Sequence, residues 1–89
     1  MEQIGVYILQ SEKNKRYYIG STNNITRRLE EHNSGKVSST RNIGPLVLRC
    51  FISCKDLTEA KKSEFRLKQY KRRDIIEKII KDSIFPWNY

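Results

Sequence analysis

The stretch IGVYILQSEKNKRYYIGS, residues 4–21, decides the fold of this chain. Its two ends, residues 4–10 and 16–21, are rich in the β-branched and aromatic side chains that strands favour. The polar residues 11–15 between them have the composition of a turn. We therefore expect two strands joined as a hairpin, and the strands of a hairpin pair antiparallel.

Two tripeptides in this hairpin, Gly5-Val6-Tyr7 and Tyr18-Ile19-Gly20, would bring two phenols and two glycines close together. Successive side chains on a strand point to opposite faces, so only one of Tyr17 and Tyr18 can share a face with Tyr7. The alternative is that these are ordinary strand aromatics, with the glycines at bulges. Glycine on a strand also marks the close approach of another backbone or a ligand.

A helix and a third strand are expected after the hairpin. Residues 22–24, Thr-Asn-Asn, offer N-cap side chains for a helix over residues 25–33. Gly35 stands where a C-terminal glycine cap belongs. Residues 36–45 are polar and loop-like, and residues 46–53 form a strand that can join the hairpin in one sheet.

Two further helices are expected in the last third of the chain. Residues 56–59, Asp-Leu-Thr-Glu, have capping-box spacing and open a helix that runs to about Arg72. We expect Asp74 to cap a final helix over residues 75–81. The tail, residues 84–89, is too aromatic to be a loose end and is expected to pack back onto the domain.

These elements follow the order β-β-α-β-α-α and predict an α+β fold, a small three-stranded antiparallel sheet flanked by helices. The chain has 89 residues, which gives room for one small domain, so we expect residues 1–89 to fold as a single unit. Hydrophobic residues make up 37% of the chain, which is enough for a globular structure.

The chain is strongly basic, with a formal net charge of +8. A surplus this large on a small domain favours a polyanionic partner, nucleic acid first and an anionic membrane surface second. Membrane binding needs a basic amphipathic helix with bulky apolar residues along one face, which the isoleucines of residues 75–80 offer. A small domain needs that same face for its core, so we expect the isoleucines inside and no membrane contact.

We expect a cytoplasmic protein, since Glu2 occupies the place of a positively charged leader and no apolar run has membrane-spanning length. Cys50 and Cys54 agree with this. On an extended strand they would lie on one face about 13 Å apart, too far for a disulfide. With His32 as the single histidine they also make a poor zinc ligand set, so we expect buried, reduced thiols.

Together the two tripeptides resemble the signature of the GIY-YIG nuclease family, with Val6 in place of an isoleucine. In that family an arginine on the following helix, with a histidine one turn later, lines the active site. Arg28 and His32 are four residues apart, so they share a helix face and match this pair, with Arg27 as the fallback. Residues 21–36, STNNITRRLEEHNSGK, are similar to small stand-alone bacterial members almost residue for residue. For an arbitrary Arg-His pair, a solvated basic helix face would be the simpler interpretation.

The family's third marker is a helical glutamate that binds a divalent metal. Glu64 matches it, because Glu59 belongs to the helix cap. The alternative is a surface ion pair between Glu64 and Lys68, four residues further on. One carboxylate suits Mg²⁺, which keeps most of its waters and takes further oxygens from substrate phosphates. The resemblance thus implies Mg²⁺ or Mn²⁺ as the cofactor.

Phosphodiester hydrolysis needs a base for the attacking water, relief of charge on the phosphoryl oxygens and a stabilised leaving oxygen. The resemblance implies that Tyr18 joins Tyr7, and that one of these phenols is the base, activated by cationic neighbours. Arg28 would bind the phosphate, because arginine matches phosphate oxygens bidentately and stays charged. His32 would hold a tyrosine hydroxyl or shuttle a proton, and Glu64 would hold a metal that acts as a Lewis acid.

Other residues are expected to contact the substrate. They are Gly20, Lys36, Thr40, Arg41, Lys71 and Arg72. The stand-alone members carry a lysine and a threonine-basic pair in the loop after the first helix, as this chain does, and such contacts position a nucleic-acid backbone without specifying sequence. Residues 68–73, KQYKRR, form a basic run with one aromatic; a solvated helix end favoured by the helix dipole would have the same composition.

We therefore expect a metal-dependent DNA endonuclease with little sequence specificity, because the separate targeting domain of full-size members is not seen in this chain. Its DNA substrate would be duplex, branched or single-stranded, and structure-selective cutting, nicking and action on single strands all stay open. The protein would be a monomer or a weak dimer. The main alternative is a non-catalytic nucleic-acid-binding module with the same fold. A protein-interaction domain that uses the helix of residues 75–80 would show no salt-sensitive affinity for DNA.

Overall fold

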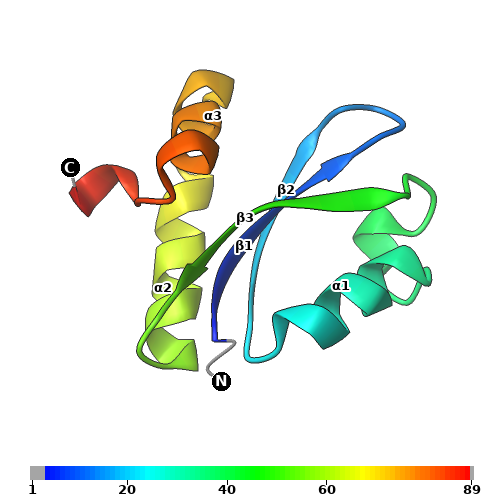
Figure 1. Cartoon of the computed structure of the whole chain (residues 1–89), viewed down its shortest axis with the longest axis horizontal. Coiled ribbons are helices and arrows are strands. Elements are labelled where there is room, and N and C mark those ends of the chain that lie inside the picture. Colours follow the sequence, from blue (N-terminus) through cyan, green and yellow to red (C-terminus); the bar gives the residue numbers. More distant parts are fainter. Residues whose placement is uncertain (1–3, 89) are drawn as a thin grey trace.

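The computed structural model describes residues 4–88, apart from the side chain of Ser39. Within this range the elements are β1 (Gly5–Ser11), β2 (Tyr17–Thr22), α1 (Ile25–Asn33), η1 (Ser38–Thr40), β3 (Leu46–Ser53), α2 (Leu57–Lys68), α3 (Arg73–Asp82) and η2 (Pro86–Asn88), where η1 and η2 are short 3-10 helices. The strands form one antiparallel sheet in the order β2-β1-β3, so β1 lies in the middle (Figure 1). The predicted α+β class and the order β-β-α-β-α-α are confirmed.

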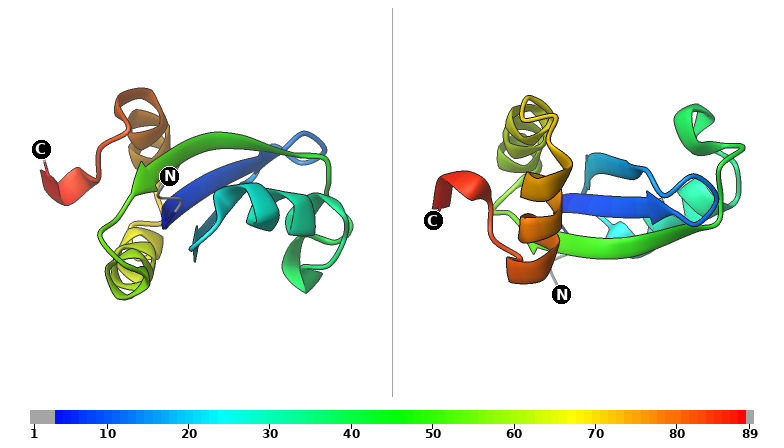
Figure 2. Two further views of the ribbon diagram at one scale, coloured as in Figure 1. Left: turned by 60° about the horizontal axis from the view of Figure 1, so that its bottom comes forward. Right: turned by 90° about the horizontal axis from the view of Figure 1, so that it is seen from above.

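The sheet separates two layers of helix, with α1 over one face and α2 and α3 over the other (Figures 1 and 2). Strand β1 is buried on both faces because helices cover both faces of the sheet, and both of its edges are paired with neighbouring strands. Val6 and Ile8 join the core beneath α2 and α3, whereas Tyr7 and Leu9 join the core beneath α1. This alternation along β1 places the two halves of the hydrophobic interior.

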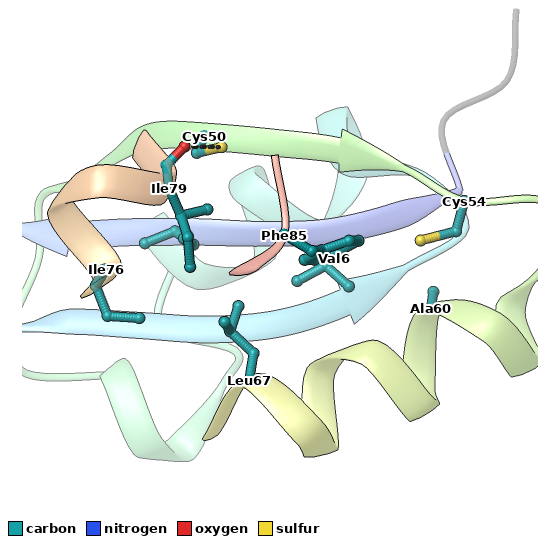
Figure 3. Packing of buried hydrophobic residues seen from close by; sticks show 9 residues of the cluster. Val6, Cys50, Cys54, Ala60, Leu67, Ile76, Ile79 and Phe85 are labelled. Atoms are coloured by element: carbon teal, nitrogen blue, oxygen red, sulfur yellow. Dashed lines mark hydrogen bonds between the residues drawn. The ribbon is translucent and has the colours of Figure 1, made fainter. Parts of the chain in front are cut away.

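The larger core lies between the sheet and helices α2 and α3 (Figure 3). Ile76 and Ile79 of α3 are buried in it, so the isoleucine face belongs to the core, as predicted. Cys50 and Cys54 are both free and buried in the same cluster, which confirms the predicted reduced thiols. None of the helices found between residues 4 and 88 is long and apolar enough to cross a bilayer.

A bulge in β3 redirects its side chains. The register of β1 against β3 shifts between Ile8 and Leu9, which pair with Cys50 and Leu48. As a result, Leu48 packs in the core beneath α1, while Cys50 packs in the core beneath α2 and α3. One extra residue in a strand reverses the faces of those that follow, so β3 contributes to both cores.

Polar caps define where α1 and α2 begin. The side chain of Asn24 accepts a hydrogen bond from the backbone N–H of Arg27, and Asp56 does the same for Glu59. Both caps were predicted. At the other end of α1, Gly35 has φ +83°, the left-handed conformation that glycine adopts without steric cost, so its predicted capping place is confirmed.

The end of α2 differs from the prediction. The helix stops at Lys68 instead of about Arg72, and Lys71 takes a left-handed φ of 52° in the turn before α3. The N-cap of α3 is Arg72, which makes no side-chain capping bond. Asp74 therefore does not cap the helix, and its carboxylate pairs with Arg72 at 2.7 Å instead. The basic residues carry no signal for this turn, because lysine and arginine are good helix formers.

The C-terminal tail packs back onto the domain, as predicted. Phe85 is buried, and its ring stacks on that of Trp87 with 4.7 Å between centroids. The Trp87 ring also stacks with that of Tyr70 at 6.4 Å between centroids, and the guanidinium of Arg66 lies 4.4 Å from the Trp87 ring centre. Tyr89, the last residue of the predicted tail, lies outside the described residues.

Candidate active site

A concave pocket of about 600 Å³ lies over the outer edge of the sheet, where β2 has no further strand beside it. Side chains from both helical layers converge there. Among the residues predicted for the site, its lining includes Tyr7, Tyr18, Gly20, Arg28, His32, Thr40, Glu64, Lys71 and Arg72. The fold thus brings nine predicted residues to one place from six different elements or turns.

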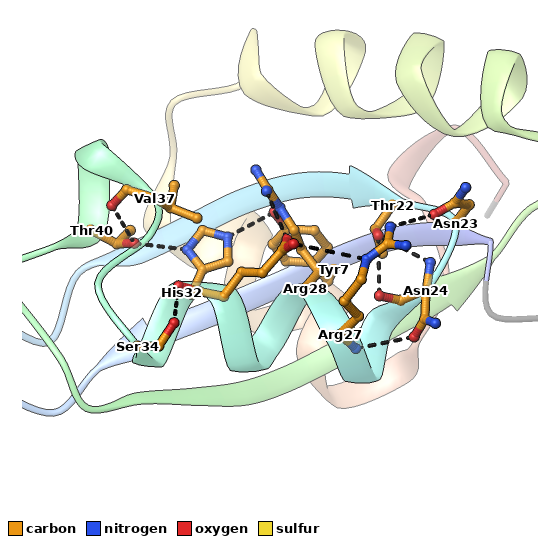
Figure 4. A network of polar contacts seen from close by, with 11 residues as sticks. Tyr7, Thr22, Asn23, Asn24, Arg27, Arg28, His32, Ser34, Val37 and Thr40 are labelled. Carbon is orange, nitrogen blue, oxygen red and sulfur yellow. Dashed lines mark hydrogen bonds and ion pairs between the residues drawn. The ribbon is translucent and has the colours of Figure 1, made fainter.

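The hydroxyl of Tyr7 is the centre of a buried polar network (Figure 4). Its oxygen lies 3.0 Å from Nε2 of His32 and accepts a hydrogen bond of 3.3 Å from Nε of Arg28. The Tyr7 side chain is only 3% exposed, and its ring meets the His32 ring edge-on. One phenol oxygen therefore contacts both a permanent cation and a proton acceptor.

Thr40 completes this network on the far side of His32. Its hydroxyl lies 2.8 Å from Nδ1 of His32 and 3.5 Å from the carbonyl oxygen of Val37 (Figure 4). The bonds are all satisfied when Nδ1 carries the imidazole proton and donates it to Thr40, which leaves Nε2 to accept from Tyr7. Thr40 was expected to contact the nucleic-acid backbone. In the folded chain Thr40 is 1% exposed and its hydroxyl is bonded to His32.

Burial lowers the pKa of His32 below its ordinary value, and the positive charge of Arg28 lowers it further. The carboxylate of Glu31 acts in the opposite direction and is the weakest of the three influences. His32 is therefore neutral at neutral pH, the state in which Nε2 can accept a proton.

Arg28 reaches the pocket from α1, with its side chain about one-third exposed. The hydrogen bond to Tyr7 raises the pKa of Arg28 above its ordinary value, with burial opposing and Glu31, 3.2 Å away, adding to the rise. Arg27, the fallback, points elsewhere: it donates to Asn23 at 2.8 Å and lies outside the pocket. The geometry thus selects Arg28 over Arg27.

Gly20 is required by the position of the Tyr7 ring. The two residues are direct partners across β1 and β2, and the ring lies flat over the glycine. A Cβ at position 20 would overlap the hydroxyl and Cζ of Tyr7 and would lie 2.9 Å from Cε1. The strand position that was expected to admit a ligand is filled by the phenol of Tyr7.

Tyr18 shares the α1 face of the sheet with Tyr7, and Tyr17 packs on the other face, as the strand alternation predicted. The Tyr18 hydroxyl accepts a hydrogen bond of 3.1 Å from the side-chain amide of Asn14 in the hairpin turn. Tyr18 thus lines the pocket without joining the bonds among Tyr7, Arg28 and His32.

Glu64 enters the pocket from α2, on the opposite side of β2. One carboxylate oxygen accepts a 2.5 Å hydrogen bond from the hydroxyl of Ser21, and the other pairs with Nζ of Lys68 at 2.6 Å. The alternative ion pair with Lys68 is therefore formed, in addition to the position at the pocket. Ser21 was not predicted, because no local pattern indicates a bond between residues 43 positions apart.

Basic side chains form the rim on the α2 and α3 side. Lys68, Lys71, Arg72 and Arg73 all line the pocket. Arg73, which was not singled out, is held by Glu77 at 3.2 Å and stacks on the Tyr17 ring at 4.7 Å.

Lys36 and Arg41, two of the predicted backbone contacts, lie outside this pocket. Both are exposed. Arg41 donates a hydrogen bond of 3.2 Å to the carbonyl of Gly35. The loop after α1 therefore contributes Thr40, the partner of His32, to the pocket. Its basic side chains Lys36 and Arg41 lie on the surface outside the pocket.

The donor set for a metal is limited to one carboxylate. Between residues 4 and 88 no group of three or more His, Cys, Asp or Glu side chains gathers to bind an ion. Mg²⁺ accepts such a site, since it is held by one or two carboxylates with waters and substrate phosphate oxygens. Glu64 fits this role because Ser21 holds one carboxylate oxygen, while the other is paired only with the half-exposed Lys68, whose place a cation can take.

A hairpin, a helix with Arg28 and His32, and a second helix with Glu64 around one pocket define a GIY-YIG catalytic domain. Residues 3–79 match the family model of that description, and the chain belongs to this nuclease family. It is also similar to several proteins that carry the name UPF0213.

Three of these relatives show the extent of the similarity. UPF0213 protein CPE1444 of Clostridium perfringens is 35% identical over 85 residues, which cover 94% of this chain and 90% of that protein. UPF0213 protein DP2720 of Desulfotalea psychrophila is 41% identical over 66 residues, 72% of this chain and 59% of that protein. UPF0213 protein OB0043 of Oceanobacillus iheyensis is 40% identical over 75 residues, 80% and 83% respectively. No solved structure gives a significant match to the chain.

Proposed function

We propose that this GIY-YIG domain is a divalent-metal-dependent endonuclease that hydrolyses DNA phosphodiester bonds with little sequence specificity. The observation that carries the proposal is the Tyr7 hydroxyl, held between Arg28 and His32 in a pocket whose opposite wall bears Glu64. Such a set supplies a base, a cation for the phosphate and a carboxylate for a metal. Family membership supports the class of chemistry and the DNA substrate.

Tyr7 is the general base in this proposal. Its proton passes to Nε2 of His32, 3.0 Å away, and the phenolate that remains is stabilised by the Arg28 guanidinium. The phenolate then takes a proton from the water that attacks phosphorus. Tyr18 is a poorer candidate, because its hydroxyl is bonded to the neutral amide of Asn14.

Arg28 also binds the scissile phosphate. Its Nε is bonded to Tyr7 and its Nη1 to Glu31, and the side chain lines the pocket. Because the guanidinium stays charged throughout, it can offset the negative charge that develops on the phosphoryl oxygens. The same cation therefore serves the base and the substrate.

Glu64 would hold the divalent cation, Mg²⁺ or Mn²⁺, with substrate oxygens and waters as the other ligands. When bound, such an ion supplies Lewis-acid stabilisation of the phosphate and the leaving oxygen. Ser21 orients the carboxylate by its hydrogen bond, and Lys68 pairs with it while no divalent cation is present.

The basic rim would bind the DNA backbone on both sides of the scissile bond. Lys71 and Arg72 are exposed beside the pocket, on the α2 and α3 side. Together with the net charge of +8, they favour a polyanion without reading its sequence. We expect DNA affinity to fall steeply with rising salt.

The decisive experiment measures cleavage of labelled single-stranded, duplex and branched DNA with Mg²⁺ or Mn²⁺. Tyr7→Phe, Arg28→Ala and Glu64→Gln should each lose activity by at least 100-fold. Tyr18→Phe should retain more cleavage activity than Tyr7→Phe, because Tyr7 is the proposed general base. Salt-sensitive DNA binding by a wild-type protein that cuts none of these substrates would favour the non-catalytic binding module.

A further inference from the structure

One aromatic side chain lies on the surface next to the proposed metal ligand. Phe65 follows Glu64 in α2 and is 70% exposed. Among the residues that the structure describes, the other exposed large apolar side chain is Ile84, at 41%. Burial in the core does not explain a phenylalanine here, because Ala60 and Leu67 form the buried face of the same helix.

Lysines surround Phe65 on the helix surface. Lys61, Lys62 and Lys68 are four residues before it, three before it and three after it, the spacings that bring side chains together on a helix. All three are exposed. Within residues 4–88 neither Lys61 nor Lys62 takes part in an ion pair, so their charge is available to an external anion.

This surface is continuous with the pocket. Glu64 and Lys68 line the pocket, and Phe65 directly follows Glu64 along α2, about 100° further around the helix on the same side as Lys68. Helix α2 also lies against the edge strand β2. A DNA strand that leaves the pocket past Glu64 over α2 would therefore meet Lys68 and then the Phe65 ring.

We propose that Phe65 stacks on an unpaired nucleobase of the substrate strand, with Lys61, Lys62 and Lys68 on the flanking phosphates. This inference rests on the proposed nuclease function and narrows its substrate to DNA with unstacked bases beside the scissile bond. Aromatic rings bind single strands in this manner, and the contact is tolerant of sequence because every base has a flat face. In an intact duplex those faces are covered by neighbouring bases.

A protein partner fits this surface less well. Stable protein interfaces bury on the order of 800 Å² per partner, with a largely apolar centre. Here a single phenyl ring stands among three cations, which is the pattern of a single-strand binding surface. The charge around the ring thus favours nucleic acid as the occupant.

The test is binding measured by fluorescence anisotropy in EDTA, which separates binding from cleavage. The probes are a labelled single-stranded oligonucleotide, the same strand as a duplex, and a strand of abasic residues of equal length. Phe65→Ala should raise Kd for the single strand about 10-fold, within the 5- to 150-fold range of base–aromatic stacking. It should change Kd for the duplex and the abasic strand less than 2-fold. Phe65→Trp should retain affinity, and the matched control Ile84→Ala should change nothing.

Equal loss on all three probes, or no loss on the single strand, overturns the stacking proposal. The stacking proposal is also overturned if sedimentation shows that the wild-type protein self-associates and Phe65→Ala does not, while the two proteins bind DNA equally. Because binding is measured without metal, these outcomes are independent of catalysis. If the wild-type protein cuts DNA and Phe65→Ala binds single strands with unchanged Kd, the stacking proposal is refuted and the proposed nuclease function stands.

Discussion

Replacing Gly20 by alanine should inactivate the protein by moving one phenol. The new methyl would overlap the hydroxyl and Cζ of Tyr7 and come within 2.9 Å of Cε1, whereas carbon atoms in contact are about 3.5–4.0 Å apart. The ring must therefore shift by about 1 Å or more. A shift of this size breaks the 3.0 Å contact with His32 and the 3.3 Å bond from Arg28.

The expected cost is about 100-fold in kcat, the typical penalty for a misplacement of about 1 Å at a reacting group. DNA affinity in EDTA should change little, because the phosphate-binding cations stay in place. Overpacking should also lower the free energy of unfolding by about 1–3 kcal/mol, which urea titration can measure. The matched control is Gly44→Ala, where the added methyl meets its nearest neighbour, Oδ1 of Asn33, at an ordinary 3.7 Å.

A double variant tests whether the loss acts through Tyr7. If it does, Gly20→Ala combined with Tyr7→Phe should cleave DNA no more slowly than Tyr7→Phe alone, since both changes remove the same function. If the double variant loses activity by the product of the two single-variant losses, the reasoning is refuted. Full activity in a folded Gly20→Ala protein would refute it as well.

Three further predictions concern titration and packing. Burial and Arg28 lower the pKa of His32 in the folded state, so as the pH falls below about 6.5 the unfolded chain takes up a proton first and the free energy of unfolding should decrease. Urea titrations across pH 5–8 should show a weaker dependence of the free energy of unfolding on pH for His32→Gln than for wild type. The same dependence in both proteins would contradict this. Leu67→Ala removes a fully buried side chain and should cost about 2–5 kcal/mol by the same measurement, against a negligible effect of the exposed Lys62→Ala. Burial raises the pKa of the Cys50 and Cys54 thiols, so a thiol reagent at pH 7.5 should label the native protein slowly and the protein in urea quickly; fast native labelling would show that the core opens.

The proton path can be tested at its buried end. Thr40→Val removes the hydroxyl bonded to Nδ1 of His32 while keeping the side-chain shape, and it should lower kcat more than tenfold with little effect on DNA affinity. Thr40→Ser keeps the hydroxyl and should restore most of the rate. Equal activity of the two variants would show that the hydroxyl does not orient His32.

Local signals were sufficient for most of the fold. The helix over residues 25–33 and the strand over residues 46–53 were predicted with the bounds that the structure has, because a capping asparagine marks the first and a mainly apolar run after Gly44-Pro45 marks the second. The end of α2 was missed, since the left-handed turn at Lys71 follows from the packing of Tyr70 against the core and has no marker of its own.

Residues of the candidate site were predictable only where they matched the family pattern or followed from helix spacing. Arg28 and His32 are one turn apart, so their common face follows from the sequence. The burial of Thr40 and its bond to His32 could not be inferred, because a polar loop carries no signal for burial. The bond between Ser21 and Glu64 joins distant segments through the packing of α2 on β2, and only the folded chain shows it.

Two consecutive residues of β2 support opposite halves of the pocket. Gly20 bears the Tyr7 ring on one face of the sheet, and Ser21 bonds to Glu64 on the other. A single peptide unit of β2 therefore separates the support of the Tyr7 phenol from the support of the Glu64 carboxylate. Inserting or deleting one residue in this strand would turn both Gly20 and Ser21 to the opposite faces of the sheet. A change in the length of β2 therefore disrupts both halves of the pocket together.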